Sequence, residues 1–363
     1  MKLVVLGLSL SSSWGNGHAT TFRALLAAMA RRGHDILFLE RDVPWYAAHR
    51  DHPDPNYCRL AFYRDLAELE AWRREIAEAD AVIVGSYVPD GIAVGQYVQE
   101  TASGVAFYDI DTPVTLAQLA AGTCVYLSPE LIAGYDLYLS FTGGPTLQRI
   151  EQCYGSPAAR ALYCSVDAAQ YAPTGAAKRW DLSYLGTYSA DRQPTLERLL
   201  IGPARTMQDR RFVVAGPQYP SEIDWPSNVE RIDHLPPSEH AAFYSASRLT
   251  LNVTRADMIA AGWSPSVRLF EAAACGTPIV SDVWDGIESL FAPGRDILLA
   301  EGAGAVEAAL NRPDLAAIGE SGRARILERH TADHRAAELE RYLLATPPRR
   351  RAGWSAGPVS AAD

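Results

Sequence analysis

One segment of the chain combines residue types that bind a diphosphate. Positions 262–282 read GWSPSVRLFEAAACGTPIVSD. Ser264 is a natural N-cap and Pro265 a natural first helical residue, so we expect a helix over 265–274. The unpaired amides of its first turn, from Ser266 onward, and the positive end of the helix dipole attract anions. The segment therefore predicts a diphosphate site.

Two charged side chains of this expected helix strengthen the prediction. Arg268 lies on the first turn, where its guanidinium can offer two parallel N–H groups to phosphate oxygens. Glu271 follows three residues later on roughly the same side, and its carboxylate could accept both hydroxyls of a ribose. A simpler interpretation is a capped helix with an exposed Arg–Glu pair, but it does not explain the whole cluster. The pattern favours a nucleoside diphosphate.

A glycine-bearing loop and a pair of aspartates bring residues suited to proton transfer. Gly15 and Gly17 precede His18, whose side chain titrates near neutral pH and could act as a general base or bind an anion without chemistry. Asp109 and Asp111 follow an apolar segment, at the carboxyl end of a strand, where α/β proteins bind ligands. One could act on the reaction and the other cap the next helix. Their spacing also imitates a metal-binding pair.

Alternating sequence patterns indicate the elements that position these residues. Apolar strands at 2–7 and 35–40 flank a helical pattern at 20–32, which predicts a βαβ unit and a parallel sheet. Similar segments continue along the chain, with one interruption. The other expected strands are 81–85, 104–108, 137–141, 181–185, 211–215, 229–232, 249–253, 278–281 and 296–299, and the other expected helices include 65–78, 90–101, 145–154 and 315–329.

The interruption indicates a domain boundary. Residues 166–178 are rich in Ala, Pro, Gly and Thr, as in a hinge, and the strand–helix alternation restarts after them. The sequence thus predicts an α/β protein with two Rossmann-like domains, 1–170 and 178–346, facing each other across a cleft. Residues 347–363 lack periodicity, and we expect a disordered tail.

Composition excludes several classes of protein. The chain has 363 residues and a formal net charge of −10, which disfavours binding to nucleic acid or to an anionic membrane. Five cysteines without a CxxC pair form neither a disulfide framework nor a structural zinc site. No apolar run approaches the roughly 20 residues of a membrane span. We expect a cytoplasmic protein without a transmembrane segment.

Several stretches resemble known glycosyltransferases. Glu271 followed by AAACGTPIVSD is similar to the donor-binding helix of retaining glycosyltransferases of fold B (GT-B), although Trp263 stands where their first glutamate contacts the donor sugar. FYDIDTPVTL, DLYLSFTGGPTL, SYLGTYSADR and SPSVRLFEAAACG, in this order over most of residues 1–345, resemble the CgeB-like family of spore-maturation-type glycosyltransferases. The resemblance implies a GT-B fold and transfer of a sugar, such as a hexose, from a nucleotide-diphosphate sugar.

The resemblance also implies roles for individual residues. Arg192 matches a basic residue that faces the diphosphate, although it could equally be a solvated residue at a helix start. His234 and Leu235 lie in the loop that holds the base through its main chain. The donor-binding residues implied or expected so far are Gly15, Gly17, Gly186, Thr187, Tyr188, Arg192, Gly216, His234, Leu235, Trp263, Ser264, Pro265, Ser266, Arg268 and Glu271.

The catalytic residues and the outcome of the reaction are left open by these patterns. Gly17-His18 resembles the loop of MurG-like and plant-type inverting enzymes, where a histidine can serve as base, whereas the Glu271 motif is typical of retaining enzymes. His18, Asp111 and Asp109 are therefore the catalytic candidates. The resemblance implies no metal and no cofactor besides the donor substrate, and an acceptor that the sequence does not identify.

Other functions remain compatible with the same residues. Gly15-x-Gly17 before a helix, with Glu40 at the end of the second strand, is a partial match to NAD-dependent oxidoreductases. A sugar-nucleotide epimerase and a non-catalytic nucleotide-sugar sensor would share the expected architecture.

Overall fold

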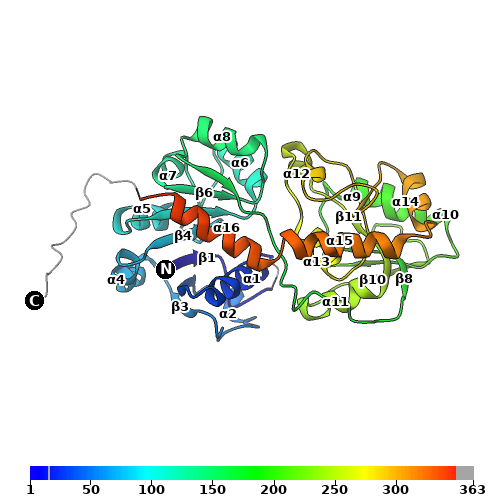
Figure 1. Ribbon diagram of the computed structural model, residues 1–363, viewed down its shortest axis with the longest axis horizontal. Coiled ribbons are helices and arrows are strands. Elements are labelled where there is room, and N and C mark those ends of the chain that lie inside the picture. Colours follow the sequence, from blue (N-terminus) through cyan, green and yellow to red (C-terminus); the bar gives the residue numbers. More distant parts are fainter. Residues whose placement is uncertain (15–16, 349–363) are drawn as a thin grey trace, which may run out of the picture. The chain divides into compact units, whose positions relative to one another are not determined.

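The computed structural model describes residues 1–14 and 17–348, so Gly15 and most of the expected tail lie outside the described residues. The chain divides into two compact units (Figure 1). Unit 1 comprises Met1–Leu162 and the chain from Ala336 onward, and unit 2 comprises Tyr163–Arg335.

Unit 1 is a seven-stranded parallel sheet in the order β3-β2-β1-β4-β5-β6-β7, with helices around it. The central strands are buried along nearly their whole length, as expected of parallel strands covered by helices on both faces. Its strands are β1 (Lys2–Gly7), β2 (Asp35–Arg41), β3 (Arg59–Tyr63), β4 (Ala81–Gly85), β5 (Val105–Asp109), β6 (Leu137–Ser140) and β7 (Ala159–Ala161). Its helices are α1 (His18–Arg31), α2 (Pro44–Ala47), α3 (Leu66–Leu69), α4 (Arg73–Ala77), α5 (Gly91–Thr101), α6 (Thr112–Ala121), α7 (Pro129–Gly134) and α8 (Pro145–Tyr154).

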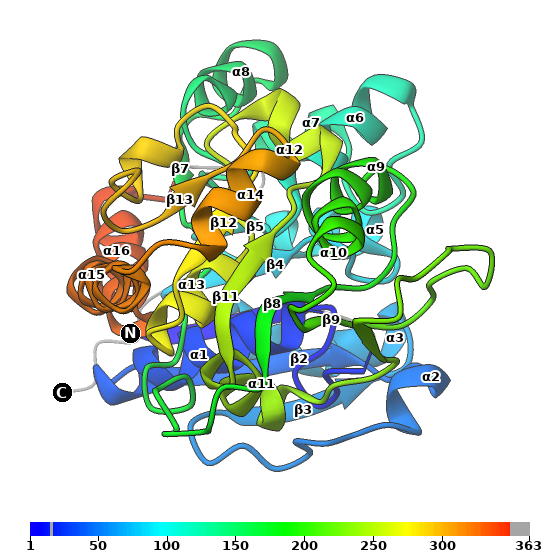
Figure 2. The ribbon, with the colours of Figure 1, turned by 90° about the vertical axis from the view of Figure 1, so that its right-hand side faces the viewer.

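Unit 2 repeats this plan with six parallel strands in the order β10-β9-β8-β11-β12-β13 (Figure 2). Its strands are β8 (Trp180–Leu185), β9 (Phe212–Ala215), β10 (Val229–Ile232), β11 (Ser247–Asn252), β12 (Ile279–Ser281) and β13 (Leu298–Leu299). Its helices are α9 (Gln193–Leu196), α10 (Gly202–Thr206), α11 (Pro237–Ser245), α12 (Ala256–Ala261), α13 (Val267–Ala274), α14 (Ala303–Leu310) and α15 (Leu315–Arg329), with a π-helical turn at Glu197–Ile201.

Each sheet has one point where the strand order reverses. In unit 1 the chain proceeds outward from β1 through β2 on one side and through β4 on the other. In unit 2 the same reversal occurs at β8, between β9 and β11. Open α/β sheets bind ligands at such points, beyond the carboxyl ends of the strands. The topology therefore indicates one candidate position in each unit.

The expected two-domain division needs a correction at both boundaries: residues 163–170, expected in the first domain, belong to unit 2, and the end of the second domain also differs. The second domain was expected to extend to residue 346, but α16 (Ala332–Ala345) passes from unit 2 into unit 1 at Ala336. Ala336 and Leu339 are buried, and the Arg32 guanidinium pairs with Glu340. Because α16 follows α15 directly in the chain, the sequence pattern assigned both helices to one domain.

Other differences concern unit 1. The expected helix 65–78 is divided into α3, a 3-10 turn at Glu70–Trp72 and α4. The edge strand β3 was missed because its residues are only partly buried and so form no strong apolar run. None of the described helices has the length and apolar composition that a membrane span requires.

Candidate active site

The guanidinium of Arg268 lies at the switch point of the unit 2 sheet. Its Nε donates to the carbonyl of Leu185, at the end of β8, and its Nη1 donates to Oδ1 of Asn252, at the end of β11, over 3.3 Å. The group also lies over the Tyr184 ring, 5.0 Å from the centroid. Arginine has five N–H donors, so these two bonds hold the side chain and leave donors for an anion. Arg268 is thus a fixed positive charge between two central strands.

Two glycines bring the backbone close to this charge. A Cβ on Gly186, just after β8, would lie 2.8 Å from Nη2 of Arg268 and 2.6 Å from the Tyr184 hydroxyl. Gly216 follows β9 with a φ of 140°, and a Cβ there would lie 2.1 Å from the Gly186 carbonyl oxygen. A side chain at either position would therefore clash with these neighbouring atoms. The structure brings Gly186, Gly216 and Arg268 together.

Helix α13 begins two residues later than the sequence predicted. Its N-cap is Ser266, not Ser264, and Ser264 and Pro265 are buried before it. The Ser266 hydroxyl donates to Asn252 Oδ1 over 2.7 Å and does not cap the helix. The expected N-cap, Ser264, was wrong because the helix begins two residues later, and at the actual N-cap Asn252, which is distant in sequence, binds the hydroxyl. The first-turn amides consequently have no cap from the Ser266 side chain.

A buried polar network that the sequence analysis missed supports this edge of the sheet. Asn252 Nδ2 donates to Thr254 over 3.1 Å and to Ser281 over 2.9 Å. Asp282 accepts the Thr254 amide and hydroxyl over 2.8 and 2.7 Å, and burial raises the pKa of Asp282. The sequence signal that could have revealed this network is that its polar residues come at the ends of apolar strands. The network fixes Asn252, and Asn252 in turn orients Arg268 and Ser266.

Glu271 is buried, with an exposed fraction of 5%. Its Oε2 lies 3.5 Å from the Tyr244 hydroxyl and 3.7 Å from Nδ1 of His240. Burial, with a smaller contribution from the Glu271 charge, raises the pKa of both Tyr171 and Tyr244. The simple interpretation of an exposed Arg268–Glu271 pair is therefore wrong, because the two side chains have separate partners.

The loop after β8 packs on its own residues. Arg192 Nη2 donates to the Thr187 carbonyl over 2.6 Å, and the Tyr188 amide donates to the Pro217 carbonyl over 3.0 Å. Nε of Arg192 is buried and has no hydrogen-bond partner among the described residues. This arginine therefore orders the loop that carries Thr187 and Tyr188, and it is not a freely solvated side chain.

The expected base-binding loop follows β10. His234 is exposed and Leu235 is half-buried. The Leu235 carbonyl lies 3.3 Å from Nε2 of His240, on α11. Sequence reasoning did not single out His240, which joins this loop to Glu271.

Trp263 adopts an unusual backbone conformation, with a φ of 44°. Its amide donates to the Asp285 carbonyl over 2.6 Å, and a Cβ on Gly286 would lie 2.4 Å from the indole. The indole therefore packs directly against Gly286, at the position where the resembled enzymes carry a glutamate.

Arg231 was not expected, and no motif marks it. It donates to the carbonyl of Gly216 over 3.0 Å and also to that of Val214. Its guanidinium lies over the rings of Tyr219 and Trp225, 4.2 and 4.7 Å from the centroids, and burial lowers its pKa. Arg231 thus supports the Gly216 loop from the neighbouring strand.

In unit 1, His18 and Tyr87 follow the two strands of the switch point. His18 is the first residue of α1, and its Nδ1 is buried without a partner in the described part of the chain. Burial lowers the pKa of His18 to about 4. Tyr87, after β4, has a φ of 62° and lies edge-on to the imidazole, with 5.3 Å between ring centroids. His18 is therefore neutral at pH 7.

Asp111 completes this group from the next strand. The Tyr87 hydroxyl donates to its Oδ2 over 3.0 Å. Asp111 occupies the N-cap position of α6, but its side chain does not cap the helix. The structure thus brings together His18 and Asp111, which the sequence predicted, through Tyr87.

Asp109 lies beneath this group and is completely buried. Its carboxylate accepts from the hydroxyls of Tyr138 and Thr115 over 2.5 and 2.7 Å, and from the Asp111 amide over 3.2 Å. Burial raises the pKa of Asp109 to about 6. With no exposed surface and three donors, Asp109 orders the turn into α6 and does not reach a substrate. The expectation of a catalytic role for it is not supported by this position.

Gly17 lies at the end of the loop after β1, and Glu40 forms hydrogen bonds with the start of this loop. Gly17 is exposed, and a Cβ on it would contact nothing within 4 Å, so no close approach requires a glycine there. Glu40 is buried and accepts from the amides of Leu10 and Ser11 over 2.6 and 2.8 Å. It cannot also bind a ribose, which removes the main residue of the oxidoreductase alternative.

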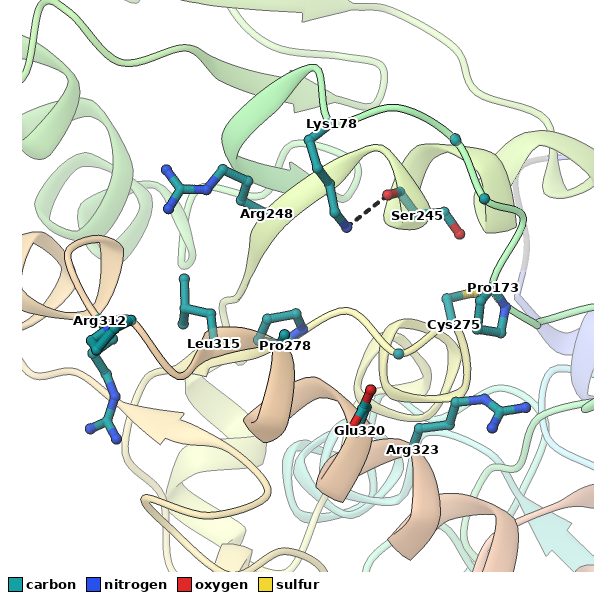
Figure 3. A pocket seen from close by; sticks show the side chains of 15 residues that line it. Pro173, Lys178, Ser245, Arg248, Cys275, Pro278, Arg312, Leu315, Glu320 and Arg323 are labelled. Carbon is teal, nitrogen blue, oxygen red and sulfur yellow. Dashed lines mark hydrogen bonds between the residues drawn. The ribbon is translucent and has the colours of Figure 1, made fainter.

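Figure 3 shows a pocket of unit 2, and Arg268 is not among the residues that line it. Its volume is about 740 Å³, and residues near the amino ends of β8, β11 and β12 line it. Arg248 and Arg312 pair with Asp181 and Asp314, and Lys178 donates to two backbone carbonyls. These cations already have partners at the edge opposite the switch point. Among the described residues, no three His, Cys, Asp or Glu side chains form a group that could hold a metal ion.

Comparison with known proteins agrees with the fold. Residues 192–341 match a family model described as glycosyl transferase-like. No curated protein sequence matches the chain. Since this family match covers α9 to most of α16, it includes Gly216, Arg268 and Glu271.

Solved glycosyltransferase structures share the fold over nearly the whole chain. Sucrose-phosphate synthase from Thermosynechococcus elongatus has a TM-score of 0.68 at 16% identity, and Anabaena HepE in complex with UDP-glucose has 0.67 at 14%. An alpha-glucosyltransferase in complex with UDP has 0.70 at 12%. Each comparison covers 95% of this chain and 100% of the other. The chain therefore has the GT-B fold.

Proposed function

We propose that this protein transfers a sugar from a nucleoside-diphosphate donor, bound by unit 2, to an acceptor bound by unit 1. The observation that carries the proposal is the convergence of Arg268, Gly186 and Gly216 at the carboxyl edge of the unit 2 sheet. A fixed guanidinium, close-approaching backbone and the first turn of α13 together suit a diphosphate.

In this proposal the charge that develops on the leaving diphosphate is stabilised by Arg268 and the α13 amides. Because Asn252 and the Leu185 carbonyl already hold the guanidinium, it does not need to reorganise during the reaction. Glu271 accepts hydroxyls of the ribose, and the loop containing His234 and Leu235 contacts the base. Several solved relatives contain UDP or UDP-glucose, which makes a uridine donor the first to test.

On the acceptor side, we propose that His18 removes the proton of the attacking hydroxyl. Its lowered pKa keeps the imidazole neutral, as a base must be. Tyr87 lies beside the imidazole and donates to Asp111, and these two side chains position the acceptor or the ring. This role for His18 favours inversion over retention of the configuration at the anomeric carbon of the transferred sugar.

Four finer features belong to the same proposal: transfer of a hexose, membership of the CgeB-like subtype, action in the cytoplasm, and independence of metal or any other cofactor. The first two follow from the sequence motifs and the third from the free cysteines. The last follows from the use of Arg268 and helix amides on the diphosphate, a role that a divalent cation performs in other transferases.

Calorimetric titration with UDP, GDP and dTDP tests the proposal, with NAD as the competing ligand. We expect one nucleoside diphosphate to bind and NAD not to bind. Incubation of the corresponding UDP-, GDP- or dTDP-sugar without acceptor then separates a transferase from an epimerase, because only an epimerase would isomerise the sugar. Binding of NAD alone would contradict the proposal.

A further inference from the structure

The imidazole of His240 lies between the loop after β10 and the buried Glu271. Its Nε2 is 3.3 Å from the Leu235 carbonyl, and its Nδ1 is 3.7 Å from Glu271 Oε2 and 3.4 Å from the Tyr171 hydroxyl. His240 is half-buried on α11, with 17% of its side chain exposed. The residue therefore contacts both elements to which the proposed function assigns the nucleoside.

The partners restrict the protonation of the ring. A carbonyl can only accept, so Nε2 must carry a proton that it donates to Leu235. In the neutral imidazole Nδ1 is then an acceptor, which suits the Tyr171 hydroxyl but places a lone pair opposite the Glu271 carboxylate. In the imidazolium Nδ1 is a donor and forms an ion pair with Glu271.

Tyr171 can serve either arrangement. Its hydroxyl is close enough to both His240 and Glu271 to bond either group. When His240 is neutral, the hydroxyl donates to Nδ1. When His240 is protonated, the hydroxyl is released to Glu271, which then has donors from both residues. A buried carboxylate requires such donors, because an incompletely compensated charge in the interior is costly.

We propose that His240 is a positioning residue which, in its protonated form, joins the base-binding loop to Glu271 and thereby strengthens nucleoside binding. This inference rests on the proposed function of unit 2. The titratable groups that contact the ring are Tyr171 from the segment before β8, Tyr244 on its own helix, and Glu271 on α13. Glu271 is the carboxylate among these contacts.

The test compares affinity for a nucleoside diphosphate across pH. UDP, GDP and dTDP are first titrated into the intact protein. The nucleotide that binds is then titrated into the wild type, His240→Gln and His240→Asn from about pH 5.5 to about pH 8.5. This range spans the ordinary titration of a histidine side chain. We expect both variants to bind about 5- to 20-fold more weakly than the wild type at the acidic end, a difference of about one tenfold step in affinity. At the basic end we expect wild type and variants to agree within about twofold.

Comparison with the wild type at each pH removes the titration of the ligand phosphate. Glu239→Gln, an exposed neighbour on α11, is the matched control and should follow the wild type throughout. A loss of affinity of the same size at every pH is what a merely structural role of His240 would give. That result, or no loss of affinity at any pH, would overturn this inference but not the proposed function. If the wild type binds none of the three nucleotides, the proposed function fails with it.

Discussion

The two sheets present different chemistry at equivalent positions. At the switch point of unit 2 the structure places an arginine, two glycines and an uncapped helix start, all suited to negative charge. At the switch point of unit 1 it places a neutral histidine, a tyrosine and a carboxylate. The same topology therefore supports anion binding in one unit and proton handling in the other, and the side chains after the strands make the difference.

The comparison predicts its largest effect at His18. Replacement by Ala should lower kcat by about 100- to 1000-fold, because general base catalysis contributes about that much. The donor KM should hardly change, since His18 lies in unit 1. Initial rates with the identified donor and acceptor provide the measurement, and full activity of the variant would remove His18 from the mechanism.

The pH profile sharpens the same prediction. A base with a pKa of about 4 is unprotonated at neutral pH and becomes protonated only as the pH falls through that value. We therefore expect kcat to remain constant from neutral pH down to about pH 5 and to fall below it. A fall centred near the ordinary histidine pKa would mean that His18 is not the titrating base.

The next largest effect is expected at Arg268. Arg268→Ala should weaken binding of both UDP and inorganic pyrophosphate by about 100-fold, because a charge-assisted hydrogen-bond pair is lost. The affinity of Arg268→Lys should lie between those of the wild type and Arg268→Ala, because lysine keeps the positive charge but cannot offer two parallel N–H groups. The exposed Arg198 of the same unit provides the control, Arg198→Ala, which should bind like the wild type. Unchanged affinity in Arg268→Ala would refute the donor site.

A smaller and more selective effect is expected at Glu271. Glu271→Gln should weaken UDP binding by about tenfold, as expected for loss of hydrogen bonds to a charged group. Pyrophosphate, which has no ribose, should bind with unchanged affinity. Isothermal titration of both ligands separates the two cases, and an equal loss for both would place Glu271 at the diphosphate.

The smallest effect on activity is expected at Asp109. Since its folded-state pKa of about 6 exceeds the ordinary aspartate value, the folded protein binds more protons and loses stability as the pH rises from about 4 to about 6. Asp109→Asn should remove this dependence, so its Tm relative to the wild type should rise by a few degrees over that range. Thermal melts at several pH values measure it, and a kcat far below that of the wild type would restore Asp109 to the catalytic candidates.

Much of the fold could be predicted from sequence because parallel strands leave a direct signal. The buried runs at β1 and β4 and the pattern of α1 are readable from apolar periodicity alone. The edge strand β3 and the return of α16 to unit 1 were not readable. Both depend on what packs against a half-buried segment, which a local pattern does not contain.

For the candidate site, the sequence by itself determined the residue types: the glycines after β8 and β9, Arg268 and Glu271 on one short helix, and the histidine at the start of α1. Only the tertiary structure decided their partners. It directed the Ser266 hydroxyl to Asn252 and buried Asp109 under Tyr138. Hydrogen bonds and desolvation act between residues far apart in the chain, so the role of a polar side chain depends on neighbours that folding brings to it.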